Sequence, residues 1–423
     1  MGRPIEGESF QVEVNEETLK KVAQIFGYPR PPPRSNTVYL HSKPAIGSDQ
    51  RYFIRRGRLV IEREHTLTQM NGGSLPANLK RTSALRRVPP LRKIRFAANH
   101  AQEGDVCAFE LPGDAASITV ESSTGRMMEI APGDTFLATP GHRQSRRWAV
   151  GALPQDGLVP GNEYWVVCEC GVVGELLSRS DRKMGHLGRV RYLGTVRGSD
   201  GGALNIRQFS VTGSGGTDRD APVYLILGTS TDVGKTTAGI AILRALRIKG
   251  QTTVIALKAT GTPGIAEIAR YQDFGAAQAF DCIDFGVPTT YPPGRPGISE
   301  FLGNMLDFCL SLPADAVLVE CAGDPVSANA PELLACLKAR RSDLKITLAA
   351  ADALGALGAK HALAEIGLTI NLITGPCTDT PILRQRTEAL CGIPAVNLLR
   401  DPHLGMQSVL VGSGAPTITL TRD

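Results

Sequence analysis

The stretch from Tyr224 to Gly250, YLILGTSTDVGKTTAGIAILRALRIKG, decides the fold of the C-terminal half. An apolar run is followed by a glycine-containing loop and then by a helical pattern, in which Ile240, Leu243 and Leu246 share one face. Such a loop directs several backbone N–H groups and the positive end of the helix dipole at one point, which suits a phosphate. The stretch therefore predicts a strand, a phosphate-binding loop and a helix that ends at Gly250.

The loop departs by one residue from the standard phosphate-binding spacing. Gly228 lies one position further from Gly234 than G-x-x-x-x-G-K-[ST] requires. In this interpretation Lys235 pairs with the terminal phosphates and the hydroxyl of Thr236 coordinates Mg²⁺. The alternative is a turn that merely opens a helix, and the coincidence of strand, loop and helix argues against it. The candidate nucleotide-binding residues are Thr231, Asp232, Val233, Gly234, Lys235, Thr236 and Thr237.

Further apolar runs follow this unit and are separated by helical segments. They read VYLILG, TTVIALK, AVLVE, LKITLAA and TINLITG. Continuous apolar runs indicate strands that are buried on both faces, so we predict an α/β domain with a doubly wound parallel sheet. The sequence GSGGTDRD has the composition of a flexible connection. We therefore expect a domain at 1–212, a linker at 213–220 and the phosphate-loop domain at 221–423.

The N-terminal part has a different pattern. Asn15 is placed to cap a short helix in which Leu19, Val22 and Phe26 share a face, and a run of three prolines then breaks that helix. Alternating runs such as RYFIRRGRLVIERE follow, and from about residue 105 to 209 short strands are separated by turn signals. The pattern predicts a mainly-β domain with a leading helix and a small barrel or sandwich.

Several blocks of the C-terminal half resemble dethiobiotin synthetase. The loop GTSTDVGKT is similar to the family's GTDTEVGKT, and Lys258 precedes small and hydroxyl residues as in the family. QDFGAAQ, which contains Asp273, is similar to SDALALQ, VPTTYPP to a Pro-Thr-Ser-Pro segment, and VECAGD, which contains Glu320, to VEGAGG. These blocks appear in the family's order over roughly 180 residues, the size of one domain. The resemblance covers residues 221–400, and the N-terminal half has no counterpart in that family.

The resemblance implies an ATP- and Mg²⁺-dependent enzyme that phosphorylates a carboxylate or carbamate to drive ligation. Lys235 and Lys258 would be catalytic, and Lys258 would neutralise charge on the acceptor as the phosphoryl group moves. Mg²⁺ prefers a few hard oxygen ligands, which Thr236, Asp273 and Glu320 supply. Simpler alternatives are a solvated helix position for Asp273, a solvent-facing strand end for Glu320 and a snorkelling side chain for Lys258.

Departures from the family limit the carry-over. Cys321 and Asp324 replace glycines, so the walls of the substrate pocket differ and another substrate than that of dethiobiotin formation is expected. Gly375 and Pro376 stand where the family has an asparagine, which leaves base selectivity open. ATP is preferred because no N-K-x-D segment argues for guanine. Alternative functions are a nucleotide-dependent switch, a metallochaperone-type NTPase, or a P-loop acyltransferase-like enzyme of unassigned substrate.

Other expectations concern partners and surroundings. The related synthetases bind substrate at a dimer interface, so we expect a homodimer and a small-molecule substrate, with the N-terminal domain assisting substrate binding or assembly. The composition, 42% apolar and 21% charged, and the absence of a targeting or membrane-spanning segment favour a cytoplasmic protein. The basic stretch 80–95 is interpreted as a solvated face rather than a nucleic-acid site. Cys168 and Cys170 are interpreted as buried free thiols rather than zinc ligands.

Overall fold

The computed structural model describes residues 10–13, 38–39, 50–55, 58–63, 73–75, 79–91, 94–145, 149–179, 187–212 and 220–402. The chain divides into two compact units, Met1–Met70 and Asn71–Asp423. The helix predicted to follow Asn15 and all but the last residue of the linker 213–220 lie outside the described residues. No helix in the described part of the chain combines the length and apolar character needed to cross a bilayer.

The first unit contains an antiparallel sheet. Its strands are β1 (Phe10–Glu13), β2 (Val38–Tyr39), β3 (Gln50–Arg55) and β4 (Arg58–Arg63), in the order β1-β4-β3-β2. The β3–β4 pair is a hairpin in whose backbone register Arg55 is paired with Arg58. The alternating run RYFIRRGRLVIERE therefore forms strands, as its period of two predicts.

The second unit begins with a β domain of ten strands in one sheet and a separate β9–β10 ribbon. The elements are β5 (Gly73–Leu75), β6 (Lys80–Arg81), η1 (Ser83–Leu85), β7 (Ile94–Ala97), β8 (Cys107–Glu110), β9 (Ile118–Glu121), β10 (Met127–Ile130), β11 (Thr135–Pro140), β12 (Arg143–Gln144), β13 (Ala149–Ala152), β14 (Glu163–Val166), β15 (Val172–Arg179), β16 (Arg189–Val196) and η2 (Ile206–Phe209).

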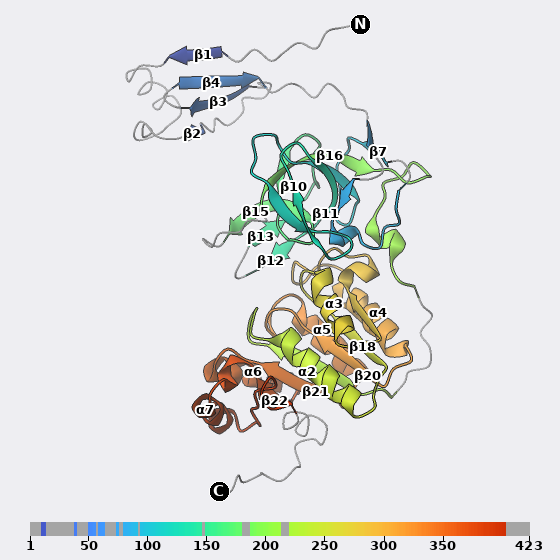
Figure 1. Ribbon diagram of the computed structural model, residues 1–423, viewed down its shortest axis with the longest axis vertical. Helices are drawn as coiled ribbons and strands as arrows, with labels where there is room; N and C mark the ends of the chain where they lie inside the picture. The colour runs from blue at the N-terminus through green and yellow to red at the C-terminus, as the bar shows by residue number, and fades with distance from the viewer. Residues whose placement is uncertain are drawn as a thin grey trace. The chain divides into compact units, whose positions relative to one another are not determined.

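Five of these strands close into a ring. β15 pairs with β11, β11 with β8, β8 with β16, β16 with β14, and β14 again with β15. The ring encloses an aromatic core in which Phe109 lies 6.0 Å from Phe136 and 5.5 Å from Tyr192 between ring centroids. Closure leaves these five strands without a free edge, so the small barrel predicted from the strand pattern is confirmed (Figure 1).

The same unit continues into a six-stranded parallel sheet with the order β19-β18-β20-β17-β21-β22. Its strands are β17 (Val223–Gly228), β18 (Val254–Lys258), β19 (Gln278–Asp281), β20 (Ala316–Glu320), β21 (Lys345–Ala349) and β22 (Ile370–Thr374). All five apolar runs singled out in the sequence are strands of this sheet. β17 lies between β20 and β21, which is the point where a doubly wound sheet changes direction and opens its ligand crevice.

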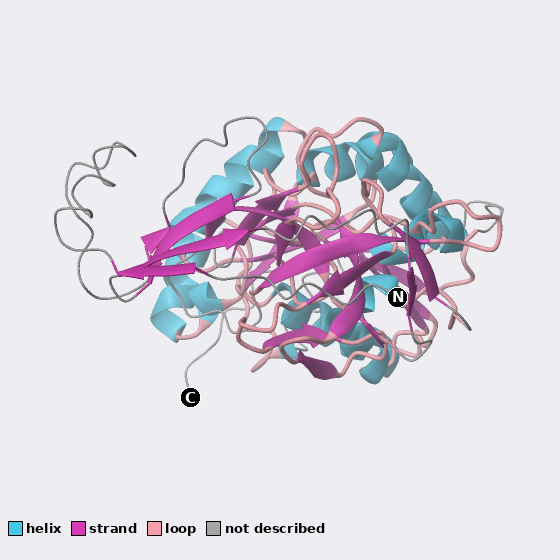
Figure 2. Cartoon of the chain, turned by 90° about the horizontal axis from the view of Figure 1, so that it is seen from above, coloured by secondary structure: helices cyan, strands magenta, loops and turns pink. Residues whose placement is uncertain are grey.

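Helices cover both faces of the sheet, as Figure 2 shows. They are α2 (Lys235–Ile248), α3 (Ile265–Asp273), α4 (Ile298–Ser311), α5 (Ala330–Arg340), α6 (Ala353–Glu365) and α7 (Pro381–Cys391), with short η3 (Cys282–Phe285) and η4 (Pro376–Thr378) turns. Alternate residues of β17 enter two separate cores: Leu225 packs with α4, α5 and α6, whereas Ile226 packs with α2 and α3. The predicted α/β architecture with a separate mainly-β region is therefore confirmed.

The barrel and the parallel-sheet domain share buried contacts. One nitrogen of the Arg86 guanidinium lies 2.6 Å from carboxylate oxygens of both Asp281 and Asp284, and Ile283 packs into the barrel-side core. Arg86 belongs to the basic stretch 80–95, and its side chain is only 8% exposed, so the expectation of a solvated face is wrong for this residue. The domain boundary predicted at 213–220 separates two sheets of one compact unit and stays a prediction.

Candidate functional site

The loop between β17 and α2 has the geometry of a phosphate-binding loop. α2 begins at Lys235, directly after Gly234, whose φ of 92° lies in the left-handed region that glycine tolerates. A Cβ atom at Gly228 would lie 2.7 Å from the Lys235 stem, so the lysine side chain can fold back over the loop only because position 228 is glycine. The longer spacing of the motif is thus accommodated within the strand–loop–helix unit formed by β17 and α2.

Lys235 is held inside this loop. Its Nζ donates hydrogen bonds to the carbonyl oxygen of Ser230 at 2.6 Å and to that of Gly323 at 3.2 Å. Burial lowers the pKa of Lys235, and the Glu320 carboxylate partly offsets this effect. The hydrogen bonds of this ammonium group run to neutral backbone carbonyls. A charged phosphate would be a stronger partner.

Thr236 and Glu320 come together at the end of the loop. The Thr236 hydroxyl donates a hydrogen bond to one Glu320 oxygen at 3.1 Å, and the Tyr271 hydroxyl donates to the other at 2.5 Å. Glu320 ends β20 next to the loop strand β17 and is 3% exposed, so it does not face bulk solvent. Burial raises the pKa of Tyr271 well above its usual range, which keeps this phenol a hydrogen-bond donor.

Lys258 ends β18 on the neighbouring strand, where it pairs in register with Glu320. Its ammonium group forms an ion pair with Glu267 in the first turn of α3. Only 8% of the Lys258 side chain is exposed, whereas 45% of Glu267 is exposed. The lysine is therefore held at the pocket by an acidic partner that solvent can reach.

Asp273 does not join this group. It is the last residue of α3 and is exposed, whereas α3 contributes Glu267 and Arg270 from nearer its start to the pocket. Gly275, with φ of 101°, follows the helix end, so QDFGAAQ is a helix terminus and a turn into β19. The similarity to a helical block therefore misplaced Asp273. The carboxylate that α3 places beside Lys258 is that of Glu267, six positions earlier.

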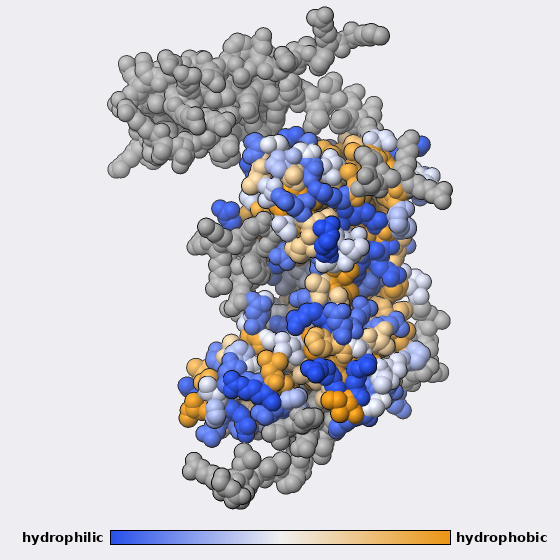
Figure 3. All heavy atoms as spheres, viewed as in Figure 1, coloured by the Kyte–Doolittle hydropathy of each residue, from blue (hydrophilic) through white to orange (hydrophobic). Residues whose placement is uncertain are grey.

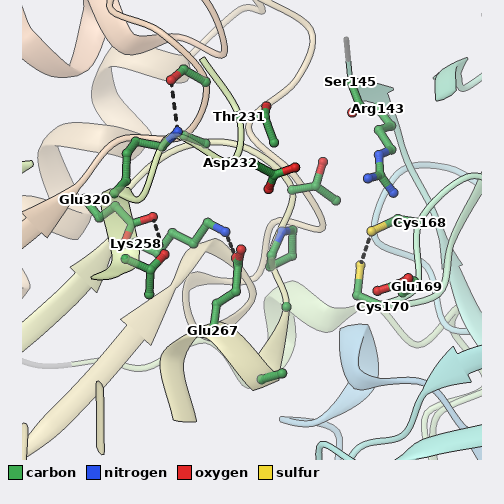
Figure 4. Close-up of a pocket in the computed structure, with 18 of the residues that line it drawn as sticks. Arg143, Ser145, Cys168, Glu169, Cys170, Thr231, Asp232, Lys258, Glu267 and Glu320 are labelled. Atoms are coloured by element: carbon green, nitrogen blue, oxygen red, sulfur yellow. Dashed lines mark hydrogen bonds and ion pairs between the residues drawn. The ribbon is translucent and has the colours of Figure 1, made fainter. Parts of the chain in front are cut away.

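These side chains line one wall of a cavity of about 570 Å³. Thr231, Asp232, Gly234, Lys235, Thr236 and Thr237 line it from the loop, while Val233 is buried and does not. The opposite wall comes from the barrel and from the β9 and β12 strands beside it, and it includes Glu121, Arg143, Ser145, Cys168, Glu169 and Cys170. Figure 3 shows the surface hollowed where the two domains meet, among mainly hydrophilic side chains. Figure 4 shows Arg143 and the two cysteines across from Lys258, Glu267 and Glu320.

Glu121 ties the barrel to this site. Its carboxylate accepts hydrogen bonds from the backbone N–H groups of Ile265 at 2.9 Å and Ala266 at 2.8 Å. These are first-turn donors of α3, which Gly264, its N-cap residue, leaves without a side-chain cap. Ser83 donates to the same carboxylate. A residue of the β9–β10 ribbon thus holds the start of the helix that carries Glu267 and Tyr271.

The sequence missed four residues of this site. Tyr271 and Glu267 lie on α3 within two turns of the expected Asp273. A search of this helix for polar side chains that could reach Lys258 could have pointed to them. Glu121 and Arg143 come from strands of the β domain that precede Gly228, the start of the loop, by 107 and 85 residues, and no local motif marks them. Only the folded arrangement brings them to the pocket.

The donor set fits a magnesium nucleotide. The helix start and loop amides form a phosphate cradle, and the Thr236 hydroxyl and Glu320 carboxylate are hard oxygen ligands already within 3.1 Å of each other. The Lys235 side chain lines the same cavity. A phosphate-binding loop and two oxygen ligands of the kind that Mg²⁺ prefers therefore lie on one wall.

No family model matches the chain, and no curated protein matches it either. Among solved structures, the signal recognition particle 54 kDa protein from Aeropyrum pernix K1 with GDP aligns at a TM-score of 0.31 and 19% identity, covering 42% of this chain and 41% of that one. The receptor FtsY from Elizabethkingia anophelis with GDP gives 0.32 and 15%, over 45% and 60%. A ParA family ATPase from Chlorobium tepidum TLS gives 0.28 and 12%, over 46% and 93%. The chain thus spans less than two thirds of the first two proteins.

Proposed function

We propose that this chain is an ATP- and Mg²⁺-dependent enzyme that phosphorylates a small carboxylate or carbamate and so activates it for ligation. The observation that carries the proposal is the pocket itself. Lys235, Thr236 and Glu320 stand together on one wall, Lys258 lies beside them, and the barrel faces them with Arg143. The three basic groups would pair with the phosphates of a nucleotide and with an acidic acceptor.

The loop residues would hold the nucleotide. The amides at the start of α2 would bind phosphate oxygens, and Lys235 would exchange the carbonyls of Ser230 and Gly323 for the terminal phosphates. Thr236 and Glu320 would hold Mg²⁺, with Tyr271 keeping the Glu320 carboxylate in place. Magnesium, when bound, neutralises charge on the phosphate oxygens.

The acceptor would bind between Lys258 and the barrel wall. An acceptor carboxylate oxygen attacks the terminal phosphorus, a P–O bond forms, and the bond to ADP breaks with the electron pair leaving on ADP. Lys258 would release Glu267 and pair with the acceptor oxygens instead, because a substrate carboxylate can replace a carboxylate that is 45% exposed. Arg143 offers a planar guanidinium that suits the acceptor's second acidic group.

Three alternatives remain distinguishable by their acceptor dependence. A nucleotide-dependent switch or metallochaperone-type NTPase would hydrolyse ATP without a small acid, and an acyltransferase-like enzyme would form product from an acyl donor without ADP. We favour the acceptor-dependent kinase step because Lys258 lies at the same pocket as the loop.

The homodimer implied by the resemblance is also a proposal, and light scattering at the enzyme concentrations used for the assay would test it.

The test measures ADP formation by the full chain with aliphatic mono- and dicarboxylic acids, and with aliphatic diamines supplied with bicarbonate. We expect at least one acid to raise ADP formation. Lys258→Met should then lower acceptor-dependent turnover by roughly 10²–10³-fold, as the loss of one charge-stabilising donor does. Lys249→Met is the matched control, because Lys249 is exposed at the far end of α2. ADP formation that no acid changes, with Lys258→Met equal to Lys249→Met, would contradict the proposal.

A further inference from the structure

Two thiols stand in the barrel wall of the pocket. Cys168 and Cys170 occupy the turn between β14 and β15, and their sulfur atoms lie 3.3 Å apart. Both residues are buried from bulk solvent, yet both line the cavity, so the cavity is their route to small molecules. Such a pair differs from the other buried cysteines, which have no second sulfur among their described hydrogen-bond partners.

The turn that carries the thiols is held by backbone contacts. The Gly171 N–H donates to the Cys168 carbonyl at 2.9 Å and closes the turn, and the Ala84 N–H donates to the Cys170 carbonyl at 2.9 Å. Gly171 has φ of 88°, and a Cβ atom there would lie 2.2 Å from Thr82. The sulfur atoms are therefore kept near each other by the fold and not by a flexible loop.

The charges around the pair separate the two thiols chemically. The hydrogen bond from the Cys170 S–H, helped by the Arg143 guanidinium, lowers the pKa of Cys168 to about 6. The same hydrogen bond raises the pKa of Cys170 well above its usual range. Two acidic groups lie near the pair: Glu169 in the turn opposes the lowering of the Cys168 pKa, and Glu121 on β9 adds to the raising of the Cys170 pKa. These opposite shifts favour the thiolate form at Cys168 and the thiol form at Cys170.

We propose that Cys168 and Cys170 form a peroxide-reactive dithiol in the pocket wall, in which Cys168 is oxidised first and Cys170 resolves the product. The Cys168 thiolate attacks one oxygen of a hydroperoxide; an S–O bond forms, the O–O bond breaks, and hydroxide or alkoxide leaves and takes up a proton. Cys168 is oxidised to the sulfenic acid and the peroxide is reduced.

The second step needs no further reagent. The Cys170 sulfur attacks the Cys168 sulfur, the S–S bond forms, the S–O bond breaks, and the Cys170 proton leaves with hydroxide as water. A disulfide bond measures about 2.05 Å. The sulfurs, now 3.3 Å apart, close this gap by side-chain rotation within the turn. The wall opposite Lys258 then loses its thiolate, and the charge facing the site becomes more positive.

The experiment treats the full chain with hydrogen peroxide, blocks remaining thiols by alkylation and maps the peptides by mass spectrometry. We expect an intramolecular disulfide in the peptide that holds Cys168 and Cys170. With Cys170→Ser, the reaction should stop at a Cys168 sulfenic acid that dimedone traps. Cys336→Ser is the control, because Cys336 is half-buried on α5, outside the pocket lining, and burial raises its pKa. Equal oxidation of Cys336 and Cys168, or no disulfide, would overturn the proposal.

A measurement on the unchanged chain guards against variants that fail to fold. The rate of Cys168 alkylation by iodoacetamide should reach half its plateau near pH 6, since only the thiolate reacts. A half-point at or above the ordinary cysteine pKa of about 8.5 would overturn the assignment of Cys168 as the attacking thiol.

A last arm rests on the proposed function. ATP with Mg²⁺ should slow both alkylation and peroxide oxidation of Cys168 several-fold, because a bound nucleotide would fill the cavity that leads to the thiols. If the disulfide forms at the same rate with and without ATP, nucleotide occupancy of this cavity is contradicted while the dithiol chemistry stands. If no disulfide forms although ATP binds, the dithiol proposal fails alone.

Discussion

Replacing Arg86 tests how the barrel is joined to the parallel-sheet domain. One Arg86 nitrogen lies 2.6 Å from both Asp281 and Asp284, with the three side chains 8%, 1% and 8% exposed. Removing one partner of a buried ion pair leaves uncompensated charge and costs about 3–5 kcal/mol. Arg86→Met should therefore lower the free energy of unfolding by about 3–5 kcal/mol. The measurement is equilibrium unfolding in urea, followed by circular dichroism.

Arg340→Met is the matched control for Arg86→Met. Like Arg86, Arg340 pairs with aspartate: two of its nitrogens lie 2.6 and 2.8 Å from the Asp307 carboxylate oxygens. The Arg340 and Asp307 side chains, however, are 27% and 55% exposed. A solvent-exposed pair contributes only about 0–1 kcal/mol. Equal effects of the two substitutions, or a cost for Arg86→Met below about 1 kcal/mol, would refute the reasoning from burial.

The pH dependence of the stability lost in Arg86→Met is a second test of the same ion pair. Burial raises the pKa of Asp284, and the Arg86 guanidinium opposes this shift. Without Arg86 the folded-state pKa rises further, so stability present at acidic pH is lost as the pH rises through that value. The gap between variant and wild type should therefore shrink as the pH falls from 7 toward 4. Adding Asp281→Asn and Asp284→Asn to Arg86→Met should recover part of the loss at neutral pH.

Two further substitutions, one of them with a matched control, test the phosphate-loop wall. Gly228→Ala places a Cβ atom 2.7 Å from the Lys235 stem, so acceptor-dependent ADP formation should fall at least tenfold, while circular dichroism shows the fold retained. Gly358→Ala on α6 is the control, because a Cβ atom there meets no atom within 4 Å. It should raise the free energy of unfolding by about 0.5–1 kcal/mol. Tyr271→Phe removes a donor from buried Glu320 and should cost about 1–3 kcal/mol of unfolding free energy and weaken Mg²⁺-dependent turnover; unchanged values on both counts would contradict its role.

The sequence predicted the parallel-sheet domain well because its signals are local. Continuous apolar runs mark buried strands, and the Gly228–Thr236 loop carries its own chemistry. The resemblance pointed to Lys258 and Glu320, and both lie at the ends of such strands, at one edge of the parallel sheet. The strand β19 was missed because it is four residues long and amphipathic, with only a weak apolar pattern.

Other features depended on contacts between distant segments. Asp273 was misplaced because the motif similarity carried over the residue type but not its position along the helix. Asp273 is the last residue of α3, and Gly275 follows the helix end. Arg86 looked like one cation in a basic face, since no local pattern shows that Asp281 and Asp284 would cover it. Gly375, which replaces an asparagine of the resembling family, is explained by packing: a Cβ there would lie 2.8 Å from the Val233 carbonyl of the loop.

The central claim is that Thr236 and Glu320 hold the magnesium of a nucleotide bound at the loop, and calorimetric titration with ATP at increasing Mg²⁺ tests it most directly. Wild type should bind ATP more tightly as Mg²⁺ rises. Thr236→Val keeps the side-chain shape but lacks the hydroxyl that lies 3.1 Å from Glu320, so its ATP affinity should stay at the weaker, magnesium-free level. An affinity that rises with Mg²⁺ equally in both proteins would contradict the claim.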